Sequence, residues 1–113
     1  MQLENMNDAD WISLVDFVTY EQSDPCDDRP DDVAICGVIL AKIHAFRHKG
    51  QPTPDFDEKE MALIDRVVES EVLTCAVNWD DADNRKAAMV YLPLFGKVRN
   101  ARNAIQNQPD LVN

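Results

Sequence analysis

The sequence predicts an all-α protein that folds as a compact bundle of four helices, or five if the last one breaks. Only three of the 113 residues are glycine, and the Asn-Gly and Asp-Gly pairs that mark tight β-hairpins do not occur. Four segments instead carry apolar residues at helical spacing. Proline-containing or acidic stretches separate these segments, as expected where helices end.

The first expected helix covers residues 8–22. Asn7 or Asp8 can cap its start, since short polar side chains accept hydrogen bonds from the free N–H groups of a first turn. Its apolar side chains fall on one face of a helical wheel: Trp11, Leu14, Val15 and Val18. This pattern indicates a surface helix with one buried stripe.

The second expected helix covers residues 31–49, and Gly50 follows it. Two acidic residues, Asp31 and Asp32, stand in its first turn, and three basic ones stand in its last, which is the charge order that a helix dipole favours. Between Val33 and Phe46 the polar side chains are Lys42 and His44. Because so apolar a helix can be buried on more than one side, we expect it at the centre of the bundle.

The third helix is expected over residues 54–78, with Thr53 as its cap and Pro54 in the first turn, where a missing N–H does no harm. The end of this segment reads "VLTCAV", residues 72–77. Its β-branched content makes a strand there an alternative.

The last expected helix covers residues 81–107. Pro93 lies off the centre of its apolar face and predicts a kink, while Gly96 leaves a hinge or two shorter helices as alternatives. The apolar residues repeat every seven positions and form a seam over residues 87–105: Ala87, Tyr91, Leu94, Val98, Ala101 and Ile105. Such a seam packs lengthwise, either inside a monomer or between the two chains of a homodimer.

Length and composition indicate one acidic domain over residues 1–113, with frayed tails at 1–7 and 108–113. The net charge is -10, from 11 basic and 21 acidic side chains. That charge repels nucleic-acid phosphates and anionic lipids, so we expect direct binding to neither. The three cysteines form no close pair, and the first residues lack the pattern of a signal peptide. These features favour a cytoplasmic protein.

Acidic and basic segments alternate along the chain. The net charges are -9 for residues 1–32, +3 for 33–50, -8 for 51–83 and +4 for 84–113. The alternation predicts that part of the acidity is neutralised inside the fold or by a second copy of it.

Size and charge together predict a non-enzymatic protein that docks on a basic surface of another protein and needs no cofactor. This profile is typical of immunity proteins, anti-defence proteins and DNA mimics, whose partners include nucleic-acid-binding proteins. The expected contact residues are two clusters of aspartates: Asp24, Asp27, Asp28, Asp31 and Asp32 in the first, and Asp80, Asp81 and Asp83 in the second.

Two alternatives stay open at this point. The first is a small metal-dependent hydrolase that uses carboxylates and histidines, because His44 and His48 are one helical turn apart and Glu60 and Glu71 fall within the apolar arc of the third helix. The second is a structural subunit that self-associates through the 87–105 seam.

Overall fold

The computed structural model describes residues 1–24 and 30–106, except for the side chains of 105 and 106. Within these ranges it contains no strand, and residues 72–77 are helical. The four helices are α1 (Asp8–Ser23), α2 (Asp32–His48), α3 (Glu58–Val77) and α4 (Ala82–Gln106). The predicted all-α class is therefore confirmed.

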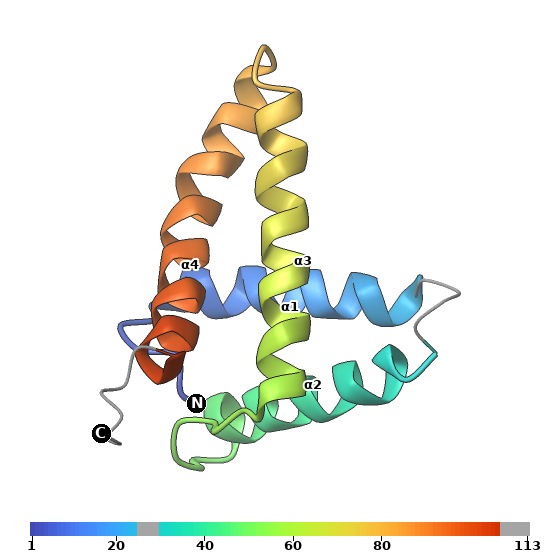
Figure 1. Ribbon diagram of the computed structural model, residues 1–113, viewed down its shortest axis with the longest axis vertical. Coiled ribbons are helices and arrows are strands. Elements are labelled where there is room, and N and C mark those ends of the chain that lie inside the picture. Colours follow the sequence, from blue (N-terminus) through green and yellow to red (C-terminus); the bar gives the residue numbers. More distant parts are fainter. Residues whose placement is uncertain (25–29, 107–113) are drawn as a thin grey trace.

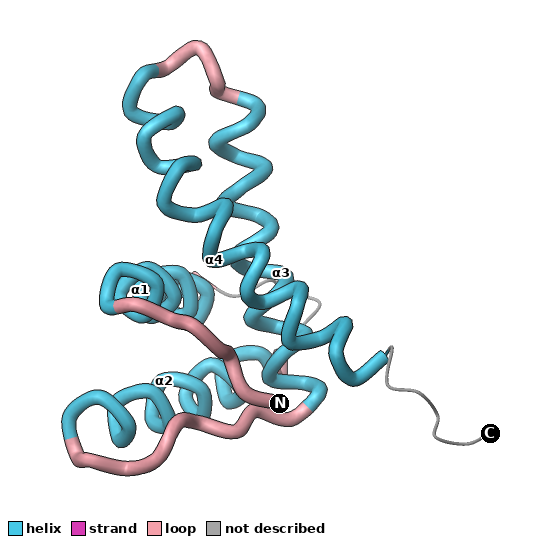
Figure 2. The backbone as a smooth tube through the Cα atoms, turned by 90° about the vertical axis from the view of Figure 1, so that its left-hand side faces the viewer, coloured by secondary structure: helices cyan, strands magenta, loops and turns pink. Residues whose placement is uncertain are grey.

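The helices form two pairs that cross each other. α1 and α2 lie side by side at the base, and α3 and α4 rise from this base, so that the turn between them stands clear of α1 and α2 (Figures 1 and 2). α3 contacts each of the other three helices, whereas α2 contacts α1 and α3 but, within the described ranges, not α4.

The predicted central position of the apolar helix 31–49 is wrong, since α1 and α3 are the helices that contact all three others within the described ranges. α2 buries Cys36, Ile39 and Ile43 and leaves Val33 and Val38 exposed to solvent. Apolar content alone did not decide the position, because α3 can enter the core with charged residues that its neighbours neutralise. α2 starts at Asp32.

Capping side chains set the start of α1 and α3. The carboxamide of Asn7 accepts from the N–H of Asp10 at 2.8 Å, and the Asp10 carboxylate accepts from the N–H of Asn7 at 3.1 Å. Asp57 and Glu60 form the same reciprocal pair, both bonds being 2.8 Å long. α3 therefore begins at Glu58, and the predicted start at residue 54 is wrong because the stronger cap lies later in the sequence.

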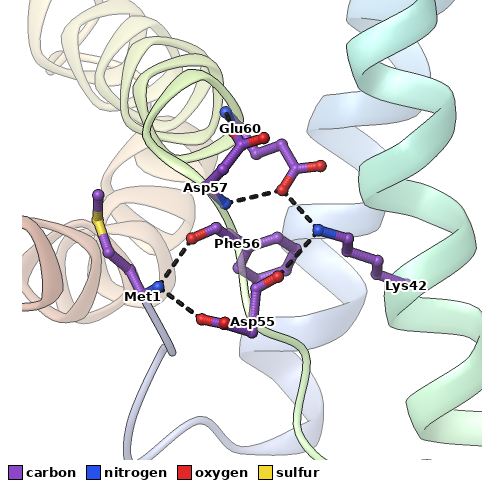
Figure 3. A network of polar contacts seen from close by, with 6 residues as sticks. All are labelled: Met1, Lys42, Asp55, Phe56, Asp57 and Glu60. Carbon is purple, nitrogen blue, oxygen red and sulfur yellow. Dashed lines mark hydrogen bonds and ion pairs between the residues drawn. The ribbon is translucent and has the colours of Figure 1, made fainter.

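The predicted fraying of residues 1–7 is also wrong. The side chain of Leu3 is buried in the core. The Met1 ammonium donates to the Asp55 carboxylate at 2.6 Å and to the Phe56 carbonyl at 2.8 Å, and the Phe56 N–H donates back to the Met1 carbonyl at 2.7 Å (Figure 3). This ammonium lowers the pKa of the Asp55 carboxyl. The other predicted tail, 108–113, lies outside the described residues.

α4 continues through Pro93 and Gly96, so the alternative of two shorter helices is wrong. The kink at Pro93 stays a prediction. The described part of the 87–105 seam faces the protein's own core, in which Leu94 and Val98 are fully buried and Tyr91 packs against them. This burial favours packing of the seam inside one chain, and its use as a homodimer interface stays a prediction.

Candidate functional site

The structure divides the first predicted acidic cluster. Asp24 and Asp31 are exposed, and Asp27 and Asp28 lie outside the described residues. Asp32 is instead half-buried and accepts a hydrogen bond from the Arg66 guanidinium at 2.5 Å. Its carboxylate thereby ties the start of α2 to α3, and its role in partner binding stays a prediction.

The second predicted cluster lies on the turn between α3 and α4. Asp80, Asp81 and Asp83 are all exposed there. The Asp81 carboxylate also accepts from the N–H of Asp83 at 2.8 Å, which stabilises the start of α4. The turn thus presents three carboxylates to solvent without a described cation in salt-bridge contact.

The two clusters do not form one patch. The end of α1 and the start of α2 lie at the right of the molecule and the α3–α4 turn at its top (Figure 1). A partner that contacts both clusters would therefore have to span a whole side of the domain. Each cluster is better considered as a separate surface.

Ion pairs between helices bury several carboxylates. The charge alternation of the sequence predicted such neutralisation but did not identify the residues that pair. The carboxylates of Asp10, Glu60 and Asp65 are nearly inaccessible to solvent, and each is bound by cations from another helix. Lys97 of α4 donates to Asp10 in α1. The capping-box spacing around Asp10 and Glu60 was a sequence signal for two of these positions.

The arginines of α3 and α4 complete the set of internal pairs. Arg99 and Arg102 donate to the two oxygens of Asp65 at 2.8 and 2.5 Å, and Arg99 also binds Glu69. Arg66 bridges Glu21 and Asp32 at the facing ends of α1 and α2. Lys42 of α2 reaches Glu60 at 2.7 Å (Figure 3). The prediction that part of the acidity is neutralised inside the fold is confirmed.

These pairs leave the net charge at the surface. Among the described residues, salt bridges between side chains engage five cations and six carboxylates. The described residues hold ten of the 11 cations and eighteen of the 21 carboxylates of the sequence, so five described cations and twelve described carboxylates lie outside the pairs. Within the described residues the paired side chains therefore carry a net charge of -1, whereas the side chains outside the pairs carry -7.

The residues of the metal-site alternative are not brought together. Glu60 is bound by Lys42 and by the Asp57 N–H. His44 and His48 are exposed on α2, with ring centroids 4.9 Å apart. In residues 1–24 and 30–104, no three His, Cys, Asp or Glu side chains are grouped so that they could hold a metal ion.

An exposed apolar surface on the outer halves of α3 and α4 was not predicted. We define the arm as residues 70–92, the part of the two helices and their turn farthest from the base. Its large apolar side chains are between 42% and 83% exposed: Leu73, Val77, Trp79, Met89, Val90 and Leu92. In the sequence, Met89, Val90 and Leu92 stand outside the seam, and this offset was the signal that an apolar surface faces outward.

The described cysteines are buried and free. Burial raises the pKa of the Cys36 thiol from 9.0 to about 11, and Glu21 and Asp32 contribute to the shift. Burial likewise raises the pKa of Cys75, with Glu71 adding to it. Raised pKa values and burial both reduce the amount of reactive thiolate, so neither residue is suited to nucleophilic chemistry.

Iodoacetamide at pH 8 should modify Cys36 at least about 100-fold more slowly in the folded protein than in urea, because the raised pKa lowers the thiolate fraction by that factor. Peptide mass spectrometry would follow each cysteine separately. Comparable rates in both solvents would contradict the burial of this thiol. The folded state holds the Cys36 proton more tightly than the unfolded state does. The protonated thiol therefore contributes to the free energy of unfolding in full below pH 9.0, and this contribution is lost as the pH rises to about 11.

No protein-family model, curated protein or solved structure matches the chain. No helix in the described parts of the chain is long and apolar enough to cross a bilayer.

Proposed function

We propose that this protein is a non-catalytic binding module that docks on a basic surface of a partner protein and blocks it. The observation that carries the proposal is the division of charge between the inside and the outside of the fold. Five cations are engaged in ion pairs between helices, while twelve carboxylates of the described residues lie outside those pairs. The domain therefore presents a strongly negative field to solvent.

A cleft that binds nucleic-acid phosphates carries the complementary charge. The partner class that fits best is a nucleic-acid-binding protein, and the protein would act on it as an immunity protein, an anti-defence protein or a DNA mimic does. Such a field raises the association rate by roughly 10- to 1000-fold and loses this effect as salt rises. The exposed residues expected to steer the encounter are Asp24 and Asp31 near the α1–α2 connection and Asp80, Asp81 and Asp83 on the arm.

The test begins with affinity capture on the immobilised protein at low salt and elution at high salt. Captured proteins are identified and purified, and their association and dissociation rates are then measured by surface plasmon resonance at several salt concentrations. We expect a basic partner whose association rate falls steeply with salt while its dissociation rate changes little. A set of partners without a basic surface, or rates that are independent of salt, would overturn the proposal.

Three double variants with the same change in net charge would locate the contact. Asp24→Lys/Asp31→Lys and Asp80→Lys/Asp83→Lys alter the two clusters, and Glu4→Lys/Asp16→Lys is the control at exposed positions elsewhere. The second of these variants keeps Asp81, which stabilises the start of α4.

At least one cluster variant should lower the association rate about 10-fold, and by more than the control does. An equal loss in all three variants would show that net charge alone matters and that the clusters have no special role.

A further inference from the structure

Most of the large apolar side chains that are exposed in the described part of the chain lie on the arm. Of the ten large apolar side chains that are exposed among the described residues, six lie within residues 73–92. Exposed apolar residues are ordinary when they are scattered, whereas a concentration of them marks an interaction surface. Figures 1 and 2 both show that the turn of the arm is not covered by α1 or α2. A partner therefore has free access to it.

A groove of about 610 Å³ connects the arm with the body of the protein. It extends from Ala62 to Asn78 on α3, and its apolar lining includes Leu73 and Val77. Arg99 and Arg102 also line it, but both are already bound to Asp65. Because these arginines are neutralised, the groove is suited to apolar side chains more than to an anion.

The charge of the arm determines which partner fits. Residues 70–92 carry four carboxylates and two cations, and one of these cations, Arg85, donates to the Trp79 carbonyl at 2.7 Å. The exposed aspartates of the turn directly follow α3, the helix that lines most of the groove, in the sequence. A ligand that places apolar groups on Leu73 and Val77 would thus meet negative charge next to them, which favours a cationic ligand.

A second copy of the chain is a poor occupant. Each copy carries a net charge of -10, so two arms would approach against mutual repulsion. An anionic membrane surface is repelled for the same reason. A helix with one apolar face and flanking Lys or Arg side chains satisfies both the groove and the acidic turn, and helices commonly bind to grooves in this way.

We propose that the arm binds a cationic amphipathic helix of the partner protein. Its apolar side chains contact Leu73, Val77 and Trp79, and its cations pair with Asp80 and Asp83. This inference rests on the proposed function and adds to it the location of the contact and the kind of element that the partner contributes.

The two tryptophans allow a direct test. Trp79 is 48% exposed on the arm, whereas Trp11 is buried in the core. The probe is a synthetic amphipathic helix of Lys and Leu, compared with a polylysine of equal charge and an amphipathic helix of Glu and Leu. We expect the Lys/Leu helix to shift the protein's tryptophan emission to shorter wavelength, and Trp79→Phe to abolish the shift.

A matched pair of variants tests the apolar contact. Leu73→Ala/Val77→Ala should weaken binding of the Lys/Leu helix about 10-fold, as expected when central apolar contacts are truncated. The control Ile12→Ala/Val38→Ala removes exposed side chains of similar size from α1 and α2, and its affinity should stay within about twofold of wild type.

Each other outcome has a definite meaning. Equal weakening by both variants, or equally tight binding of polylysine without an emission shift, would overturn the arm as the docking site and leave the proposed function standing. Equal binding of the Glu/Leu helix would overturn the charge requirement of the arm. If neither cationic probe binds at low salt, the proposed function fails together with the inference.

Discussion

Lys97→Met should lower the free energy of unfolding by about 3 kcal/mol, because a buried carboxylate would lose its cation. Lys97 donates to Asp10, whose side chain is 3% exposed. In the variant the Asp10 carboxylate would keep its hydrogen bond from the Asn7 N–H. It would have no described cation in salt-bridge contact. Methionine retains most of the volume of the lysine stem, so the loss reports the charge rather than a cavity.

Urea unfolding followed by circular dichroism would measure this loss. Lys86→Met on the same helix changes an exposed lysine and should stay within about 0.5 kcal/mol of wild type. The double variant Asp10→Asn/Lys97→Met should be more stable than Lys97→Met alone, since it no longer buries an unpaired charge. A single variant as stable as wild type would contradict the role of this pair.

Leu94→Ala should also cost about 3 kcal/mol, the middle of the range for a buried leucine that leaves a cavity. Leu94 is fully buried where α4 packs into the core, and it belongs to the seven-residue seam. The neighbouring Leu92 is 48% exposed on the arm. Leu92→Ala is therefore the matched control and should change the stability by less than about 1 kcal/mol.

The same pair of variants separates the two roles that the sequence allowed for the seam. A seam inside the fold makes Leu94→Ala destabilising at every protein concentration. A seam between two chains would instead make the cost depend on concentration, because association contributes to the stability of a dimer. A concentration-dependent midpoint for Leu94→Ala, or a cost no larger than that of Leu92→Ala, would contradict the packing described here.

Helical periodicity predicted the existence of all four helices and part of the buried faces of α1 and α4, although it missed the burial of Phe17 and Ala88. It was less reliable for helix starts, since α3 begins at Glu58, where the side chains of Asp57 and Glu60 exchange hydrogen bonds with the backbone. It also misplaced α2. Periodicity reports the apolar face of one helix, whereas the central position of α3 depends on cations that come from α2 and α4.

The acidic residues show the same limit at the level of the candidate site. The sequence locates runs of aspartate, but it does not distinguish Asp32 from Asp80, whose environments differ in the fold. Arg66, 34 residues later, engages Asp32, whereas Asp80 is exposed. A contact between residues so far apart has no local signal. The exposed face of the arm was not predicted, because the seven-residue repeat accounts for the buried side of α4 and not for Met89, Val90 and Leu92 beside it.

The inward placement of five cations has a consequence for how this sequence can vary. A substitution that removes an exposed carboxylate changes the surface charge by a tenth and leaves the helices in place. A substitution at Lys42, Arg66 or Lys97 instead leaves at least one partly or wholly buried carboxylate without a cation, and a substitution at Arg99 or Arg102 leaves Asp65 with one cation in place of two. Drift among natural variants should therefore be asymmetric, with acidic positions on the outside exchanging freely and these basic positions nearly fixed. The packing of the helices thus depends on basic side chains, although they are outnumbered by acidic ones in the sequence.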